Sequence, residues 1–270
     1  MKYSLFLSLF FLSQVSFARF YSPFPSTVKG ICLPNTHKVG NNDYIYRSME
    51  PYDKAALKEV LDFGIQKILI FKNPSKDELE IEKANFLALG GKKENFKIIE
   101  FPYKDMHVRD YQKYCEMVVT GLQFLENSRK QKTKTLLHCT VGEDRTGMLS
   151  GLYNYLHEPN KKLHDHTWFF KNTMCKNGYG SGNPEKPLEK VVTPIRKSLT
   201  RLYLKMAYLI EQKTLTPDKL DLSVCASDPY YNNKFRFHPK YKWESFKCSP
   251  QKVKPWICKS KNYPMKDHKK

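Results

Sequence analysis

Apolar positions along the chain form short runs that alternate with stretches of helical spacing. Apolar runs at 44–47, 68–71, 96–101 and 135–137 predict four strands. Between and after them, apolar residues at helical spacing predict helices at 51–64, 77–89, 111–125 and 148–156. Strands that alternate with helices predict an α/β fold with a mostly parallel central sheet flanked by helices. Ligands of such folds bind at the carboxyl ends of the strands.

The first eighteen residues are predicted to be an export signal. Lys2 precedes a short apolar core at 5–12, and small residues surround a cleavage position after Ala18. The apolar core is too short to span a bilayer. No later stretch is apolar enough, so we expect no membrane span. The mature chain is therefore expected to be exported, to the periplasm or as a secreted protein.

Composition divides the remaining chain into three parts. Residues 19–43 are rich in Pro, Gly and Asn and predict an N-terminal arm, residues 44–215 carry the alternating pattern, and residues 216–270 form a basic C-terminal extension. The net charge is +19, and residues 226–270 contain twelve Lys or Arg against three Asp or Glu. Such charge favours encounter with polyanions.

The candidate chemistry lies in the stretch 138–147, between a predicted strand and a predicted helix. Cys139 is followed six positions later by Arg145. Backbone N–H groups that curl ahead of a helix form an anion site, which also lowers the pKa of a thiol placed in it. Gly142 fits a loop position whose backbone conformation resists a Cβ atom.

Several residues of this stretch are predicted to have separate roles in phosphoryl transfer. Cys139 is the predicted nucleophile, and Arg145 is predicted to hold two phosphoryl oxygens with its planar guanidinium. Thr146 can donate to the sulfur when it leaves, and His138 can orient the loop. The residues expected to surround the bound phosphate are His138, Thr140, Val141, Gly142, Glu143, Asp144 and Thr146.

The loop resembles the H-C-x5-R-T signature of the cysteine-dependent protein tyrosine phosphatase superfamily, closest to its dual-specificity and phytase-like branches, which include exported bacterial members. The likeness extends over residues 44–156 and includes Tyr44-Ile45-Tyr46-Arg47-Ser48. It implies an enzyme that hydrolyses phosphomonoesters through a phosphocysteine, with no metal and no cofactor. The expected partner is an anionic phosphorylated substrate and not a nucleic acid.

A carboxylic acid must protonate the leaving group. The resemblance implies a mobile acid on the loop after the third predicted strand, where Asp105 lies. Asp110 is the weaker candidate because it directly precedes a predicted helix, where an aspartate is an expected N-cap. Asp144, next to the arginine of the loop, is a third candidate, and its alternative role is a salt bridge that holds that arginine.

The net charge and one residue of the loop bear on the substrate. The basic charge favours inositol polyphosphates, as in the phytase-like enzymes, over phosphotyrosine or phosphoserine/threonine proteins. Glu143 argues the other way, because a carboxylate at the rim of the pocket would repel a highly charged substrate. A non-catalytic protein that binds phosphate or polyanions is the alternative from another class.

Cysteine content is consistent with export. Six cysteines besides Cys139 can form three disulfides by fifteen pairings, which leaves the candidate nucleophile as the odd thiol. Cys115 falls within a helical pattern, where a buried free thiol is the ordinary expectation. The remaining five cysteines are Cys32, Cys175, Cys225, Cys248 and Cys258.

Overall fold

A computed structural model of the protein describes residues 26–73, 76–101, 110–158, 199 and 202–229. Its centre is a five-stranded sheet in the order β1-β2-β5-β3-β4. The strands are β1 (His37–Lys38), β2 (Ile45–Ser48), β3 (Lys67–Lys72), β4 (Phe96–Glu100) and β5 (Thr135–His138). Strands β2, β5, β3 and β4 are parallel, and β1 is an antiparallel edge strand. The predicted α/β fold with a mostly parallel sheet is confirmed.

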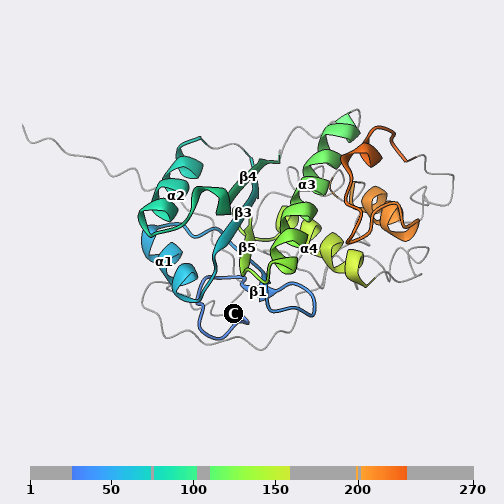
Figure 1. Ribbon diagram of the computed structural model, residues 1–270. Helices are drawn as coiled ribbons and strands as arrows, with labels where there is room; N and C mark the ends of the chain where they lie inside the picture. Colours follow the sequence, from blue (N-terminus) through green and yellow to red (C-terminus); the bar gives the residue numbers. More distant parts are fainter. Residues whose placement is uncertain (1–25, 74–75, 102–109, 159–198, 200–201, 230–270) are drawn as a thin grey trace, which may run out of the picture.

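Helices cover both faces of the sheet (Figure 1). Helices α1 (Lys54–Asp62) and α2 (Lys76–Ala88) lie on one side, and α3 (Tyr111–Lys130) and α4 (Asp144–His157) lie on the other. The described residues also contain two 3-10 helices, η1 (Lys93–Asn95) and η6 (Leu222–Cys225). Residues 202–211 are helical as well. No helix among these described residues is both long and apolar enough to cross a bilayer.

The alternation of side chains along β3 explains this two-sided packing. Ile68 and Ile70 pack in one buried cluster with residues of α1 and α2. Leu69 and Phe71 point to the opposite face and pack in the cluster built by α3 and α4. A strand that is apolar on both faces is typical of a parallel sheet covered by helices on both sides.

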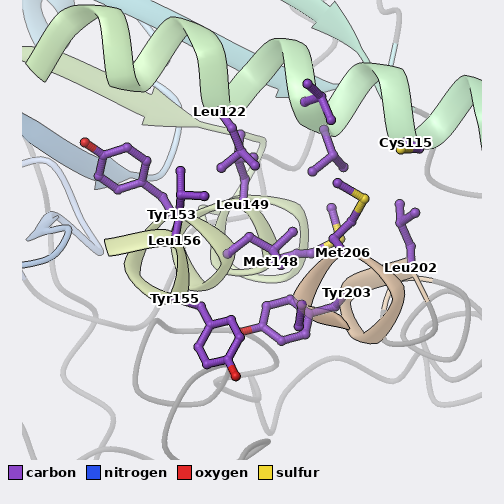
Figure 2. Close-up of a cluster of buried hydrophobic side chains, with 14 of the residues drawn as sticks. Cys115, Leu122, Met148, Leu149, Tyr153, Tyr155, Leu156, Leu202, Tyr203 and Met206 are labelled. Carbon is purple, nitrogen blue, oxygen red and sulfur yellow. The ribbon is translucent and has the colours of Figure 1, made fainter. Parts of the chain in front are cut away.

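The larger cluster continues beyond α4 to the helical residues after position 201. Leu149 of α4 and Leu122 of α3 meet there, with Met206 nearby (Figure 2). The chain then returns over α3, where Cys225 forms a disulfide with Cys115 at a Cα–Cα distance of 5.5 Å. The expectation of a free thiol at Cys115 is therefore wrong, because a segment 110 residues later in sequence packs on the face that carries it.

Residues of the expected N-terminal arm belong to the core. Ile31 and Leu33 are fully buried and pack with Tyr46 and Leu136 of the central strands. Cys32, between them, is also disulfide-bonded. The predicted export signal, the loop with Asp105, and the cysteines Cys175, Cys248 and Cys258 lie outside the described residues.

Strand register brings the candidate chemistry to one edge of the sheet. His138, the last residue of β5, is level with Ser48 of β2 on one side and with Ile70 of β3 on the other. The chain segments that follow these three strands therefore meet at the carboxyl edge of the sheet. Cys139 is the first residue beyond β5, at the position where α/β folds bind ligands.

Candidate active site

The loop from Cys139 to Glu143 turns tightly between β5 and α4. Gly142 has φ +71°, in the left-handed region that favours glycine. A Cβ atom at this position would lie 2.2 Å from the backbone oxygen of Ser48. The loop thus packs directly on the backbone at the end of β2, and its conformation requires glycine, as the sequence predicts. Helix α4 begins at Asp144, four residues earlier than the apolar pattern indicated.

Cys139 is a free thiol, 2% exposed, and its surroundings favour the thiolate. Burial is the largest single influence on the pKa of this thiol and raises it, and the charge of Arg145 is the largest influence that lowers it. The hydroxyl and the amide of Thr146 and the amide of Gly142 lower the pKa as well, and together with the arginine they outweigh burial. The net pKa is below the usual value of a cysteine, which favours the nucleophilic thiolate.

Arg145 lies in the first turn of α4, only 6% exposed. Its Nη1 is 3.4 Å from the side-chain oxygen of Asn73, and its Nη2 is 3.5 Å from the hydroxyl of Thr140. Asn73 directly follows β3, so the neighbouring strand helps to place the guanidinium. The arginine thus lies beside the sulfur, where its charge acts on both the thiolate and a bound anion.

His138 forms a buried ion pair that the sequence did not reveal. Its Nε2 is 2.9 Å from a carboxylate oxygen of Glu82 on α2, and both side chains are buried. Burial is the largest single influence and lowers the pKa of His138, but the charge and hydrogen bond of Glu82 and the charge of Glu50 together leave the net pKa raised. The imidazole Nδ1 lies 3.2 Å from the carbonyl oxygen of Cys139. His138 therefore holds the start of the loop as a charged donor, consistent with its predicted orienting role.

Glu143 is fully buried, so the expectation that its carboxylate lies at the rim of the pocket is wrong. Its electrostatic partner is Arg47 of β2, which is also buried. Burial lowers the pKa of Arg47 to about 10, while the charges of Cys139 and Glu143 act in the opposite direction. The sequence could not show this, because the direction of a side chain just before a helix depends on how the helix packs.

A second buried cation lies at the end of β3. The ammonium of Lys72 pairs with the carboxylates of Glu50 and Glu78, and its side chain is 4% exposed. Burial lowers the pKa of Lys72, but the two carboxylates reverse this and the net pKa is raised. Glu50 also donates its backbone N–H to the carbonyl of Thr140 at 3.1 Å. A lysine directly after the apolar run at 68–71 was the available sequence signal for this pair.

The candidates for the general acid have different positions. Asp105 lies outside the described residues. Asp110 occupies the N-cap position of α3, as predicted, but its exposed side chain makes no capping hydrogen bond. Asp144 is 5% exposed in the first turn of α4.

The chain resembles several solved structures at low identity. No family model and no curated protein matches it. The core catalytic domain of the PP-IP phosphatase SIW14 from S. cerevisiae, in complex with citrate, is 17% identical with a TM-score of 0.41, over 68% of this chain and 95% of that one. PTPMT1 is 13% identical with a TM-score of 0.41, over 66% of this chain and 98% of that one. A putative phosphatase from Shewanella putrefaciens is 17% identical with a TM-score of 0.37, over 62% and 87%.

Proposed function

We propose that the protein is a cysteine-dependent phosphomonoester hydrolase of the protein tyrosine phosphatase type. One observation carries the proposal. Cys139 is a free thiol whose pKa is lowered by Arg145 and by the polar groups of Thr146 and Gly142 where the loop meets α4. A nucleophile on the loop and an anion-binding arginine in the first turn of the helix that follows then lie side by side, which is the arrangement that phosphoryl transfer needs.

The reaction proceeds in two displacements. The thiolate of Cys139 attacks phosphorus, the bond to the ester oxygen breaks, and that oxygen leaves with a proton from a general acid. Water then attacks the phosphocysteine, which releases inorganic phosphate and restores the thiolate. Arg145 binds the equatorial oxygens, on which negative charge is spread in both transition states. Within the described part of the chain, the buried hydroxyl of Thr146 makes no other hydrogen bond, and it donates to the thiolate as it leaves in the second step.

Asp105 is the proposed general acid. It is tested with a substrate series of rising leaving-group pKa, because loss of the acid slows poor leaving groups most. Asp105→Asn should reduce kcat for an alkyl phosphate far more than for p-nitrophenyl phosphate. Asp110→Asn and Asp144→Asn are the matched controls. A leaving-group effect in the Asp144 variant, and none in the Asp105 variant, would assign the acid to Asp144 at the start of α4.

Inositol polyphosphates are the proposed substrates. The net charge of +19 attracts highly charged anions. Burial of Glu143 beside Arg47 removes the carboxylate that would have repelled them from the rim of the pocket. Phosphotyrosine protein is the second candidate. Phosphate release from inositol hexakisphosphate and from phosphotyrosine peptides, compared as kcat/KM, decides between them.

Export is proposed from the first eighteen residues and supported by cysteine pairing. Cys115 and Cys225 form a disulfide, and Cys32 is disulfide-bonded as well. Disulfides persist in oxidising compartments and are rare in the cytosol. Determination of the mature N-terminus after expression with its own leader tests this. A mature chain that begins after Ala18 supports export, and an uncleaved chain retained in the cytosol contradicts it.

Catalysis itself is tested with Cys139→Ser. The variant should lose turnover of p-nitrophenyl phosphate and keep binding of inorganic phosphate, because the arginine and the loop amides remain. Chelators should leave the wild-type rate unchanged. Phosphate binding without turnover in the wild type would favour the alternative of a non-catalytic polyanion-binding protein. Heparin retention after deletion of residues 226–270 would then show whether the basic extension supplies that binding.

A further inference from the structure

Three consecutive carbonyls of the loop accept hydrogen bonds from outside it. The carbonyl of Thr140 accepts from the backbone N–H of Glu50 at 3.1 Å. The side-chain amide of Asn35 donates to the carbonyls of Val141 at 3.2 Å and Gly142 at 3.0 Å. The guanidinium of Arg47 also donates to the Gly142 carbonyl. Residues from two other chain segments thus hold the outer side of the loop.

The planarity of the peptide bond makes this outer contact relevant to the sulfur. The carbonyl of one residue and the N–H of the next belong to the same plane and point in opposite directions. When the Val141 carbonyl is held outward by Asn35, the N–H of Gly142 is turned inward. That N–H is one of the two backbone amides that lower the pKa of Cys139.

Asn35 is itself fixed by a chain of hydrogen bonds. It is 1% exposed with φ +59°, a conformation that asparagine adopts more readily than most residues. Its side-chain oxygen is 3.0 Å from Nε2 of His37, and Nδ1 of that histidine is 2.8 Å from the hydroxyl of Thr27. An amide oxygen only accepts, so Nε2 carries the proton and Nδ1 accepts from the hydroxyl. Burial, followed by the charge of Arg47, lowers the pKa of His37 to about 3, so the ring is neutral.

We propose that Asn35 is a positioning residue that turns the Gly142 amide toward the sulfur of Cys139 by holding the Val141 and Gly142 carbonyls on the outer side of the loop. Its relevance to catalysis rests on the proposed phosphatase function. Asn35 touches no reacting atom and acts through the loop backbone. The segment before β1 is thereby assigned to the active site, although it precedes Cys139 by more than a hundred residues.

The test measures the pH dependence of Cys139 alkylation by iodoacetamide, alongside kcat/KM for p-nitrophenyl phosphate. Asn35→Ala should shift the alkylation midpoint upward by about one pH unit, because a displaced amide no longer stabilises the thiolate. It should lower kcat/KM by about tenfold or more, since loop geometry changes. Asn35→Asp has the same shape, but its ionised carboxylate cannot donate a hydrogen bond. It should raise the alkylation midpoint and lower kcat/KM at least as much.

The matched control is Asn41→Ala, an exposed asparagine of the same segment that contacts Glu158 and not the loop. It should leave both the alkylation midpoint and kcat/KM at wild-type values. If either Asn35 variant lost stability but kept the wild-type alkylation midpoint, Asn35 would support only the fold, and the proposal would be overturned. If the Asn35 variants do not fold, His37→Ala decides, because it leaves the amide present but unfixed. A raised midpoint supports the proposal and an unchanged midpoint overturns it.

Alkylation also separates this proposal from the proposed function, because it needs no turnover. A wild type with a low midpoint that hydrolyses no phosphomonoester would refute the phosphatase. The alkylation midpoints of the Asn35 variants would still show whether this asparagine lowers the pKa of the Cys139 thiol.

Discussion

Replacement of Gly142 by alanine perturbs the loop at the point of closest approach to the sheet. The new Cβ would lie 2.2 Å from the Ser48 oxygen and 2.7 Å from the backbone nitrogen of Met49, so backbone must move. An L-residue in the left-handed region also costs about 1–2 kcal/mol. Relief of the contact requires a displacement of roughly 1 Å, and misplacement on that scale costs catalysis about 100-fold.

Gly142→Ala should therefore lower kcat/KM for p-nitrophenyl phosphate by about 100-fold. It should also raise the alkylation midpoint of Cys139, because the displaced Gly142 amide no longer lowers the pKa of the thiol. Stopped-flow or steady-state kinetics and the alkylation profile measure the two effects on protein shown to be folded by circular dichroism.

Gly90→Ala is the matched control, since Gly90 has φ +90° but no heavy atom within 4 Å of an added Cβ. It should lose about 1 kcal/mol of unfolding free energy and keep wild-type kinetics. If Gly142→Ala also kept wild-type kcat/KM and the wild-type alkylation midpoint, the close packing of the loop on β2 would not be what fixes the active conformation.

Two further predictions concern stability. The folded pKa of His138 is raised, so its ion pair with Glu82 stabilises the fold below the unfolded pKa of about 6.5 and is lost as pH rises through the folded value. Glu82→Gln should lower the free energy of unfolding, measured by urea denaturation, by about 2 kcal/mol at pH 6 and by less at pH 9. An equal loss at both pH values would contradict a charged ion pair. Replacing Cys115 and Cys225 by serine should lower the free energy of unfolding by about 4 kcal/mol, because the disulfide restricts the unfolded chain, and should leave kcat of the folded protein near wild type. An unchanged free energy of unfolding would contradict this stabilising role of the disulfide.

The sequence predicts those features that depend on residues close together in the chain. Alternating strands and helices gave the sheet and its flanking layers, and the spacing from Cys139 to Arg145 placed the candidate site at the carboxyl edge. The positive φ of Gly142 followed from the same loop chemistry. These features depend on neighbouring residues, so their signals lie close together in the chain.

Features that depend on long-range packing were missed. Asn35 and Glu82 reach the loop from segments more than fifty residues away, and nothing in their local pattern marks them. Cys115 was correctly expected to be buried, but its partner came from a segment whose path over α3 no local pattern shows. The burial of Glu143 was misjudged for a similar reason, because Arg47 of β2 is the group it faces.

Trapping of the covalent intermediate tests the proposed chemistry most directly. Wild-type protein is mixed with excess p-nitrophenyl phosphate, quenched in acid within one turnover, digested and analysed by mass spectrometry. We predict one added phosphoryl group on the peptide that contains Cys139, located on its sulfur and absent from Cys139→Ser. Turnover with the phosphoryl group on another side chain, or with no covalent adduct under conditions that accumulate one, would contradict nucleophilic catalysis by this thiol.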